Sequence, residues 1–230
     1  KGNYDDVNRL CAEVAETLPW AFVNVNMRPY YAEGSKTLGF ETAEQLGWRL
    51  PDHVVVPIAS GALLTKIHRA FQELVAIGAV EEKAYRVSGA QPEGCRPVAQ
   101  AFQDGAEEVT PVKPDTIARS LAIGSPADGY FALQVARETG GVIAWCTEAE
   151  ILDGVKLLAS TEGVFTETAG GVTIANLKRL VDQGVIAREE EVVAYVTGNG
   201  YKTVEVFEGT VEPTYHVASD LDEFLAVLDH

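Results

Sequence analysis

Short apolar runs alternate with amphipathic segments along most of the chain. Four runs rich in valine, isoleucine and alanine are bounded by turn residues and predict strands at 53–59 (HVVVPIA), 84–91 (AYRVSGAQ), 141–147 (GVIAWCT) and 191–200 (EVVAYVTGNG). The run at 21–27 (AFVNVNM) predicts one more strand. Because the first of these runs is apolar at nearly every position, it is typical of a parallel strand that is buried on both faces.

Segments with apolar residues at helical spacing fall between these runs. Asp5 or Asp6 is expected to cap a first helix, and Ser35 a second helix that Gly47 closes. Further helices are predicted at 62–78, 97–105, 130–140, 148–163, 169–184 and 220–229. The less regular stretch 106–129 is the expected excursion from the sheet. This alternation predicts an α/β fold, with an open and mostly parallel sheet that carries helices on both faces.

Composition and charge exclude several classes of partner. The formal net charge is −16, with 34 acidic and 18 basic side chains, so we expect no nucleic-acid partner. No run approaches eighteen apolar residues, and no membrane partner is expected. The three cysteines and four histidines are scattered without metal-ligand spacing, so we predict no metal site. A cytoplasmic protein fits these features best.

The junctions where predicted strands end are the places to search for chemistry, because ligands of open α/β sheets bind there. After the run at 53–59, the small residues Ala59, Ser60 and Gly61 lead into a helix that begins with Ala62 and Leu63. Such a loop lets a phosphate approach the free N–H groups of a helix start, and a simple tight turn between strand and helix is the alternative.

Two later junctions offer further polar groups. Thr197 lies where a predicted strand opens into GNG, and its hydroxyl could bond a ring nitrogen without adding a charge; a hairpin turn is the alternative. Glu167 precedes the glycines that open the helix at 169–184, and it either lines a ligand site or complements the helix dipole.

A fourth junction gathers hydrogen-bond donors near the start of the chain. Asn26, Arg28, Ser35 and Lys36 lie within one segment between a predicted strand and a predicted helix. Such a set suits an anionic group, although a solvated loop with a capped helix would show the same residues.

Taken in order, these motifs resemble the threonine synthase family. The resemblance rests on EGSKT, PIASGALL, IGSPADG, ETAGG and TGNGYKT, and it extends to about Thr203. It implies the large domain of a fold type II enzyme that uses pyridoxal 5'-phosphate (PLP). The implied reaction converts O-phospho-L-homoserine and water to L-threonine and phosphate, and a homodimer is expected.

The resemblance also implies roles for the candidate residues. The cofactor phosphate would be bound by the residues of the first loop, Ala59, Ser60, Gly61, Ala62 and Leu63. Thr197 matches the partner of the pyridine nitrogen, and Glu167 the wall of the cofactor pocket. Asn26, Arg28, Ser35 and Lys36 lie near the donors for the substrate phosphate.

The lysine that forms the Schiff base in this family is missing from the sequence. The family carries it in a motif like SFKDR, and none of the eight lysines here has that setting. Lys36 in GSKTL is the nearest, but this element follows the Schiff-base lysine in the family, so Lys36 is interpreted as a positioning residue or a helix-surface lysine. The sequence is therefore interpreted as a carboxy-terminal portion, with 1–20 ending the smaller domain and 21–230 forming the large cofactor-binding domain.

Two alternatives stay open. A related enzyme, such as a threonine dehydratase or a cysteate synthase, would share the loop and the counterpart of Thr197. A non-catalytic fragment would explain the missing lysine, because without it the cofactor has no covalent anchor.

Overall fold

Four parallel strands form the central sheet of the computed structural model, which describes residues 2–23, 28–209 and 215–228. The strands are β1 (His53–Pro57), β2 (Arg86–Pro92), β3 (Ile143–Cys146) and β4 (Val192–Ala194), in the spatial order β3-β2-β1-β4. β1 pairs with both β2 and β4, and Val55 lies opposite Ser88 on one side and Ala194 on the other. The predicted α/β fold and its four main strands are confirmed.

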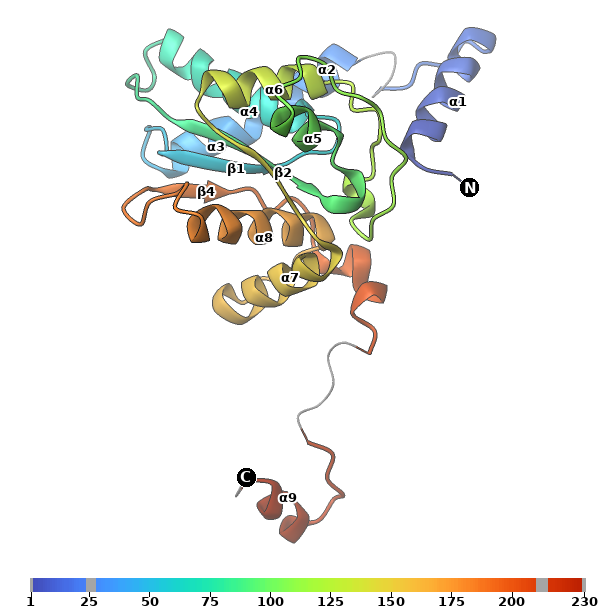
Figure 1. Cartoon of the computed structure of the whole chain (residues 1–230), viewed down its shortest axis with the longest axis vertical. Helices are drawn as coiled ribbons and strands as arrows, with labels where there is room; N and C mark the ends of the chain where they lie inside the picture. The colour runs from blue at the N-terminus through green and yellow to red at the C-terminus, as the bar shows by residue number, and fades with distance from the viewer. Residues whose placement is uncertain (1, 24–27, 210–214, 229–230) are drawn as a thin grey trace.

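Helices cover both faces of this sheet (Figure 1). The helices on one side are α3 (Thr37–Gln45), α4 (Ala62–Ala76), α5 (Pro97–Gln103) and α6 (Gly129–Glu138). On the other side α8 (Thr168–Asp182) packs against the strands, and α7 (Glu148–Glu162) packs against α8.

The alternation of side chains along β1 explains the two layers. Val54 and Val56 belong to the apolar cluster that contains Phe71 of α4, whereas Val55 belongs to the cluster that contains Val172 of α8. Successive strand residues point to opposite faces, so an apolar residue at every position is needed when both faces are covered.

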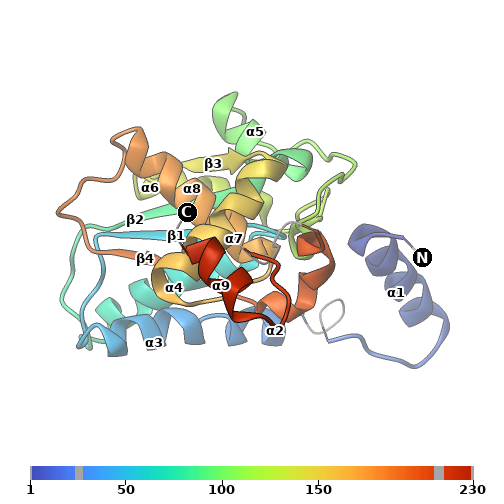
Figure 2. The same ribbon diagram turned by 90° about the horizontal axis from the view of Figure 1, so that it is seen from below.

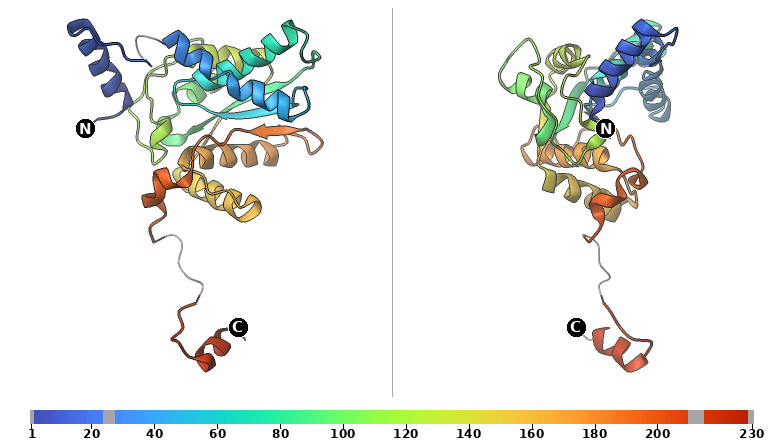
Figure 3. Two further views of the ribbon diagram at one scale, coloured as in Figure 1. Left: turned by 180° about the vertical axis from the view of Figure 1, so that it is seen from behind. Right: turned by 90° about the vertical axis from the view of Figure 1, so that its right-hand side faces the viewer.

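The amino-terminal helix α1 (Tyr4–Thr17) lies beside the sheet domain and buries none of its residues (Figures 1 and 3). Its cap is Asn3, whose side chain accepts from the Asp6 N–H, so the prediction that Asp5 or Asp6 caps the helix was wrong. Asp6 is instead the third helical residue and completes a capping box. Asp5 has another role, because its Oδ2 accepts a 2.9 Å hydrogen bond from the Gly124 N–H.

Three local expectations near the amino terminus also need correction or lie outside the structure. Of the strand predicted at 21–27, residues 21–23 are not in a strand, and 24–27 lie outside the described residues. A short helix, α2 (Arg28–Gly34), follows them. Lys36 and not Ser35 precedes α3, and no side chain caps that helix.

The remaining elements are short. Three 3₁₀ turns occur at η1 (Glu93–Cys95), η2 (Arg119–Leu121) and η3 (Gly200–Phe207). The last helix, α9 (Leu221–Leu228), buries no residue and stands away from the sheet (Figures 1 and 3). In the view from below it lies in front of the sheet domain (Figure 2). Among the described residues, no helix combines the length and apolar character that a bilayer span requires.

The burial of His53 is expected to make the stability of the fold depend on pH. It is fully buried in β1, its Nε2 lies 2.7 Å from the Ser88 Oγ, and burial is the main cause that lowers its pKa. Arg86 lowers this pKa further, and Glu190 opposes both effects. Below about pH 6.5 the unfolded chain therefore binds a proton that the folded chain does not, and the free energy of unfolding falls by up to about 1.4 kcal/mol per pH unit.

Urea unfolding at pH 7.0 and 5.5 tests this expectation. His53→Gln should lose less stability between these two pH values than the wild type, and His216→Gln, at an exposed position, should lose as much as the wild type. Equal losses in all three proteins would contradict the assignment.

Candidate active site

The order of the strands marks one place in the sheet for a ligand. From β1 the chain proceeds outward to β2 and β3, and then returns to place β4 on the other side of β1. The helix that follows β1 and the helices that precede β4 lie on opposite faces of the sheet, and such a reversal marks a crevice at the carboxyl ends of the two strands. Ser60 follows β1 and Thr197 follows β4, so the two loops with predicted cofactor residues meet this crevice.

The loop after β1 has the geometry of an anion-binding turn. Gly61 caps α4 with a φ of +96°, and a Cβ at this position would lie 2.8 Å from the Asp128 carbonyl oxygen. The Asp128 N–H donates to the Ser60 carbonyl oxygen at 2.8 Å, which ties the loop to the start of α6. The N–H groups in the first turn of α4 have no partner within the helix, so they are suited to bind a phosphate.

A cavity of about 320 Å³ opens beside this loop. It is lined by Tyr4, Asn8, Tyr31, Ala59, Ser60, Arg119, Ser120, Ile123, Ser125 and Ala127. These residues contribute five hydroxyl groups, one amide and one guanidinium, and no carboxylate or lysine is found among the described lining residues. The cavity is therefore polar and offers donors to an anionic ligand.

Glu167 connects this cavity to the loop after β4. Its side chain is buried, the Ser120 Oγ donates to Oε2 at 2.6 Å, and the Lys202 Nζ binds Oε1 at 2.8 Å. The backbone N–H of Glu167 and the Thr166 hydroxyl both donate to the Gly198 carbonyl oxygen, at 3.0 and 2.9 Å. A Cβ at Gly198 would lie 1.9 Å from the Glu167 Oε1, so only glycine fits this approach.

The structure brings together part of the predicted cofactor set. Ala59 and Ser60 line the cavity, and Gly61, Ala62 and Leu63 continue from them into α4. Glu167 joins the cavity through Ser120. Thr197 is exposed and lies next to Gly198, outside the cavity lining.

Lys36 is bound to two carboxylates and is mostly buried. Its ammonium group binds Glu33, and it bonds both carboxylate oxygens of Glu73 at 2.9 and 3.0 Å. Hydrogen bonding to these carboxylates raises the pKa of Lys36, and the bond to Lys36 lowers the pKa of Glu73. The side chain is 11% exposed, so the interpretation as a helix-surface lysine was wrong. Lys36 pairs the segment before α3 with α4.

The other predicted contacts to a substrate phosphate stay predictions. Asn26 lies outside the described residues, and for Arg28, the first residue of α2, only the backbone is described. Ser35 is partly exposed and does not line the cavity. Helix α2 reaches the cavity through Tyr31, which the sequence did not suggest.

Sequence reasoning also missed Arg119, Ser120, Ser125 and Lys202. Three of them come from the irregular stretch 106–129, where no periodicity indicates which side chains face inward. The motif IGSPADG within it was the available signal. Lys202 lies two residues after TGNG, and its place beside Glu167 depends on a contact between residues 35 positions apart.

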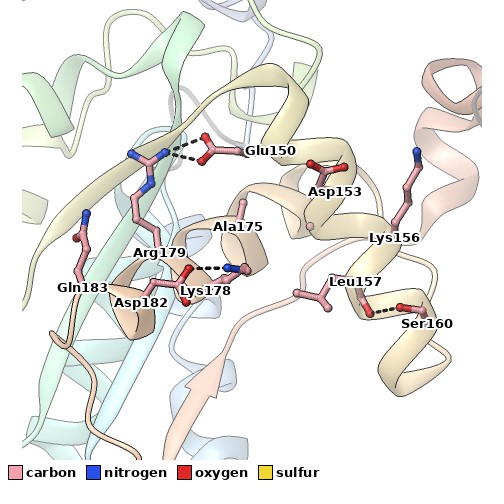
Figure 4. Close-up of a pocket in the computed structure, with 11 residues that line it drawn as sticks. Glu150, Asp153, Lys156, Leu157, Ser160, Ala175, Lys178, Arg179, Asp182 and Gln183 are labelled. Atoms are coloured by element: carbon pink, nitrogen blue, oxygen red, sulfur yellow. Dashed lines mark hydrogen bonds and ion pairs between the residues drawn. The ribbon is translucent and has the colours of Figure 1, made fainter.

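A larger groove of about 740 Å³ lies between α7 and α8 (Figure 4). Arg179 binds Glu150 there at 2.7 Å, and Lys178 binds Asp182, so four of its charged groups are paired (Figure 4). The groove contains none of the predicted site residues and lies outside the crevice between β1 and β4. The smaller cavity is therefore the better candidate active site.

Comparison with known proteins identifies the family of the chain. The sequence profile of the family described as "Pyridoxal-phosphate dependent enzyme" matches residues 1–198. The chain belongs to this family of pyridoxal-phosphate-dependent enzymes. It is 34% identical to a threonine synthase of Methanocaldococcus jannaschii and 37% identical to one of Methanosarcina acetivorans, over 99% and 93% of its length. The chain spans about half the length of these relatives, 56% and 53%.

Two solved structures share the fold of this chain. A fungal L-serine ammonia-lyase from Rhizomucor miehei aligns over 79% of this chain and 56% of its own, with a TM-score of 0.61 and 18% identity. The processed threonine deaminase isoform 2 from Solanum lycopersicum aligns over 78% and 48%, with a TM-score of 0.60 and 20% identity.

The family implies PLP as the cofactor, and the residues present fit it. Its phosphate matches the glycine turn and the first-turn N–H groups of α4, since a Cβ at Gly61 would close this turn against Asp128. The Thr197 hydroxyl, which is exposed in the loop after β4, would be a neutral partner for its ring. When bound, PLP supplies electron withdrawal from the α-carbon of an amino acid.

Replacement of Gly61 should disturb this loop more than its φ angle alone explains. Gly61→Ala adds a methyl group 2.8 Å from a backbone carbonyl, so we expect a loss of roughly 1–3 kcal/mol in the free energy of unfolding and weaker PLP binding. Gly78→Ala is the matched control, because Gly78 also has a positive φ, of +72°, but nothing lies within 4 Å of its Cβ. Urea unfolding and PLP titration check both variants; equal effects would argue against a special constraint at Gly61.

Removal of the Lys202 ammonium tests the ion pair between Lys202 and Glu167. Lys202→Gln leaves the buried Glu167 with a weaker partner, and we expect a loss of about 1–2 kcal/mol, limited because Lys202 is more than half exposed. Lys156→Gln, at an exposed position on α7, should change stability by less than about 0.5 kcal/mol. If the two variants unfold at the same urea concentration, Lys202 contributes nothing to the site.

Proposed function

We propose that this chain is the cofactor-holding portion of a threonine synthase, which converts O-phospho-L-homoserine and water to L-threonine and phosphate. The observation that carries the proposal is the donor-rich cavity beside the loop after β1, in a chain similar to threonine synthases over most of its length. The substrate has two anionic groups and an amine, and it would be held beside the cofactor in this cavity.

Different residues of the chain would bind the cofactor phosphate, contact the cofactor ring and hold the loop after β4. Ser60 and the first-turn N–H groups of α4 bind the cofactor phosphate. Thr197 offers a neutral hydroxyl to the cofactor ring, which leaves the ring a moderate electron sink. Glu167, held by Ser120 and Lys202, fixes the loop that carries Thr197. These are binding and positioning roles.

The lysine that holds the cofactor covalently would come from a segment outside these 230 residues. Two observations support this. No lysine is found among the described residues that line the cavity, and the ammonium groups of Lys36 and Lys202 are bound to carboxylates. Taken alone, the chain would bind PLP weakly and would not turn over substrate.

An assay of reaction products tests the proposed function. The longest polypeptide that contains this sequence, loaded with PLP, should release threonine and phosphate from O-phospho-L-homoserine. The 230-residue chain should bind PLP but form no threonine. Formation of 2-oxobutyrate from threonine, with no threonine from O-phospho-L-homoserine, would instead favour a threonine dehydratase. A polypeptide with neither activity would favour a non-catalytic protein.

A homodimer in the cytoplasm remains part of the proposal. The exposed apolar side chains of α1, among them Val7 and Leu10, are available to a further segment or a second copy. Sedimentation of the longest polypeptide would give its oligomeric state.

A further inference from the structure

The charge of the cavity contrasts with the charge of the chain. The sequence has a formal net charge of −16, yet among the described residues that line the cavity the guanidinium of Arg119 is the sole formal charge. Hydroxyl groups of Ser60, Ser120 and Ser125 lie around the same cavity. A cavity that holds only water does not require a positive charge and hydrogen-bond donors in its lining. An anionic ligand does require them.

The backbone that carries Arg119 is firmly placed. Ala118 and Leu121 on either side are buried in the apolar cluster that contains Val172 of α8. The Ile117 N–H donates to a carboxylate oxygen of Glu148 at 2.9 Å. Ser120 is fixed by its bond to Glu167. Arg119 therefore extends from a rigid turn at the cavity, which is how a binding residue is held in position.

The side chain of Arg119 is free to bind a ligand. It is 75% exposed, and its ion-pair partner is Glu205, with 3.4 Å between Nη1 and Oε1. This distance is longer than the 2.7–2.9 Å of a charge-assisted hydrogen bond, so the pair holds the guanidinium only weakly. Glu205 is itself 46% exposed.

We propose that Arg119 binds the phosphate group of the substrate and so selects phosphorylated substrates over their hydroxyl counterparts. This inference rests on the proposed function and names the residue that would determine its specificity. The cofactor phosphate has its own donors at Ser60 and the start of α4, whereas a second phosphate needs a different cation. A guanidinium can bind two oxygens of a phosphate at once, which a hydroxyl cannot do.

Replacement of Glu205 should change phosphate affinity in the opposite direction to replacement of Arg119. In the free protein its carboxylate competes with a phosphate for the same guanidinium. Glu205→Gln should therefore tighten phosphate binding, while Arg119→Gln should weaken it. A purely structural role of the pair would make both variants change in the same direction.

The test is a calorimetric titration of the 230-residue chain at low salt with inorganic phosphate and with O-phospho-L-homoserine, with and without saturating PLP. Arg119→Gln should lower the affinity for both phosphate ligands about tenfold or more, and Arg119→Lys should recover part of the lost affinity. Glu205→Gln should raise the affinity for both phosphate ligands several-fold. Arg188→Gln is the matched control, since it removes the same charge from an exposed arginine that does not line the cavity. PLP affinity should stay within about twofold of the wild type in all variants.

Three results would overturn the proposal. They are the absence of phosphate binding by the wild type, equal effects of Arg119→Gln and Arg188→Gln, and a loss of PLP affinity in Arg119→Gln as large as its loss of phosphate affinity. The last result would assign Arg119 to the cofactor phosphate. Failure of the proposed function would look different, because binding that depends on Arg119 would persist in a polypeptide that forms no threonine.

Discussion

A single buried carboxylate joins the segments that surround the candidate active site. Glu167 accepts from Ser120 of the stretch between α5 and α6 and from Lys202 after β4, and its own backbone binds Gly198. A buried charge is costly unless it is paired and hydrogen-bonded, so these partners must stay in place as long as the protein is folded. The site is therefore fixed by a charge that the fold cannot leave unpaired.

The sheet determines where this carboxylate lies. The return of the chain from β3 to the far side of β1 places α8 beneath the sheet, with its first residue directly after Glu167. The same return places the loop after β4 beside the loop after β1. One topological reversal thus aligns the glycine turn at Gly61, the Glu167 carboxylate and Thr197 along a single edge.

The fold could be predicted from the sequence because its signals are local. The apolar run of β1 reflects burial on both faces, and the helical spacing of α4 reflects burial on one. The glycine turn between β1 and α4, at Ser60 and Gly61, could be predicted for the same reason. The far wall of the cavity was not, because Arg119 and Ser120 lie in an irregular stretch whose inward side is chosen by contacts with Glu148 and Glu167. Lys36 was misjudged likewise, since Glu73 is 37 residues away.

We propose that PLP binds at the carboxyl ends of β1 and β4. An amide chemical-shift map of the isotope-labelled chain during titration with PLP would locate the bound cofactor. The largest shifts are expected at Gly61, Ala62 and Leu63, with further shifts at Ser120 and Gly198. Shifts confined to the groove between α7 and α8, around Glu150 and Arg179, would contradict it.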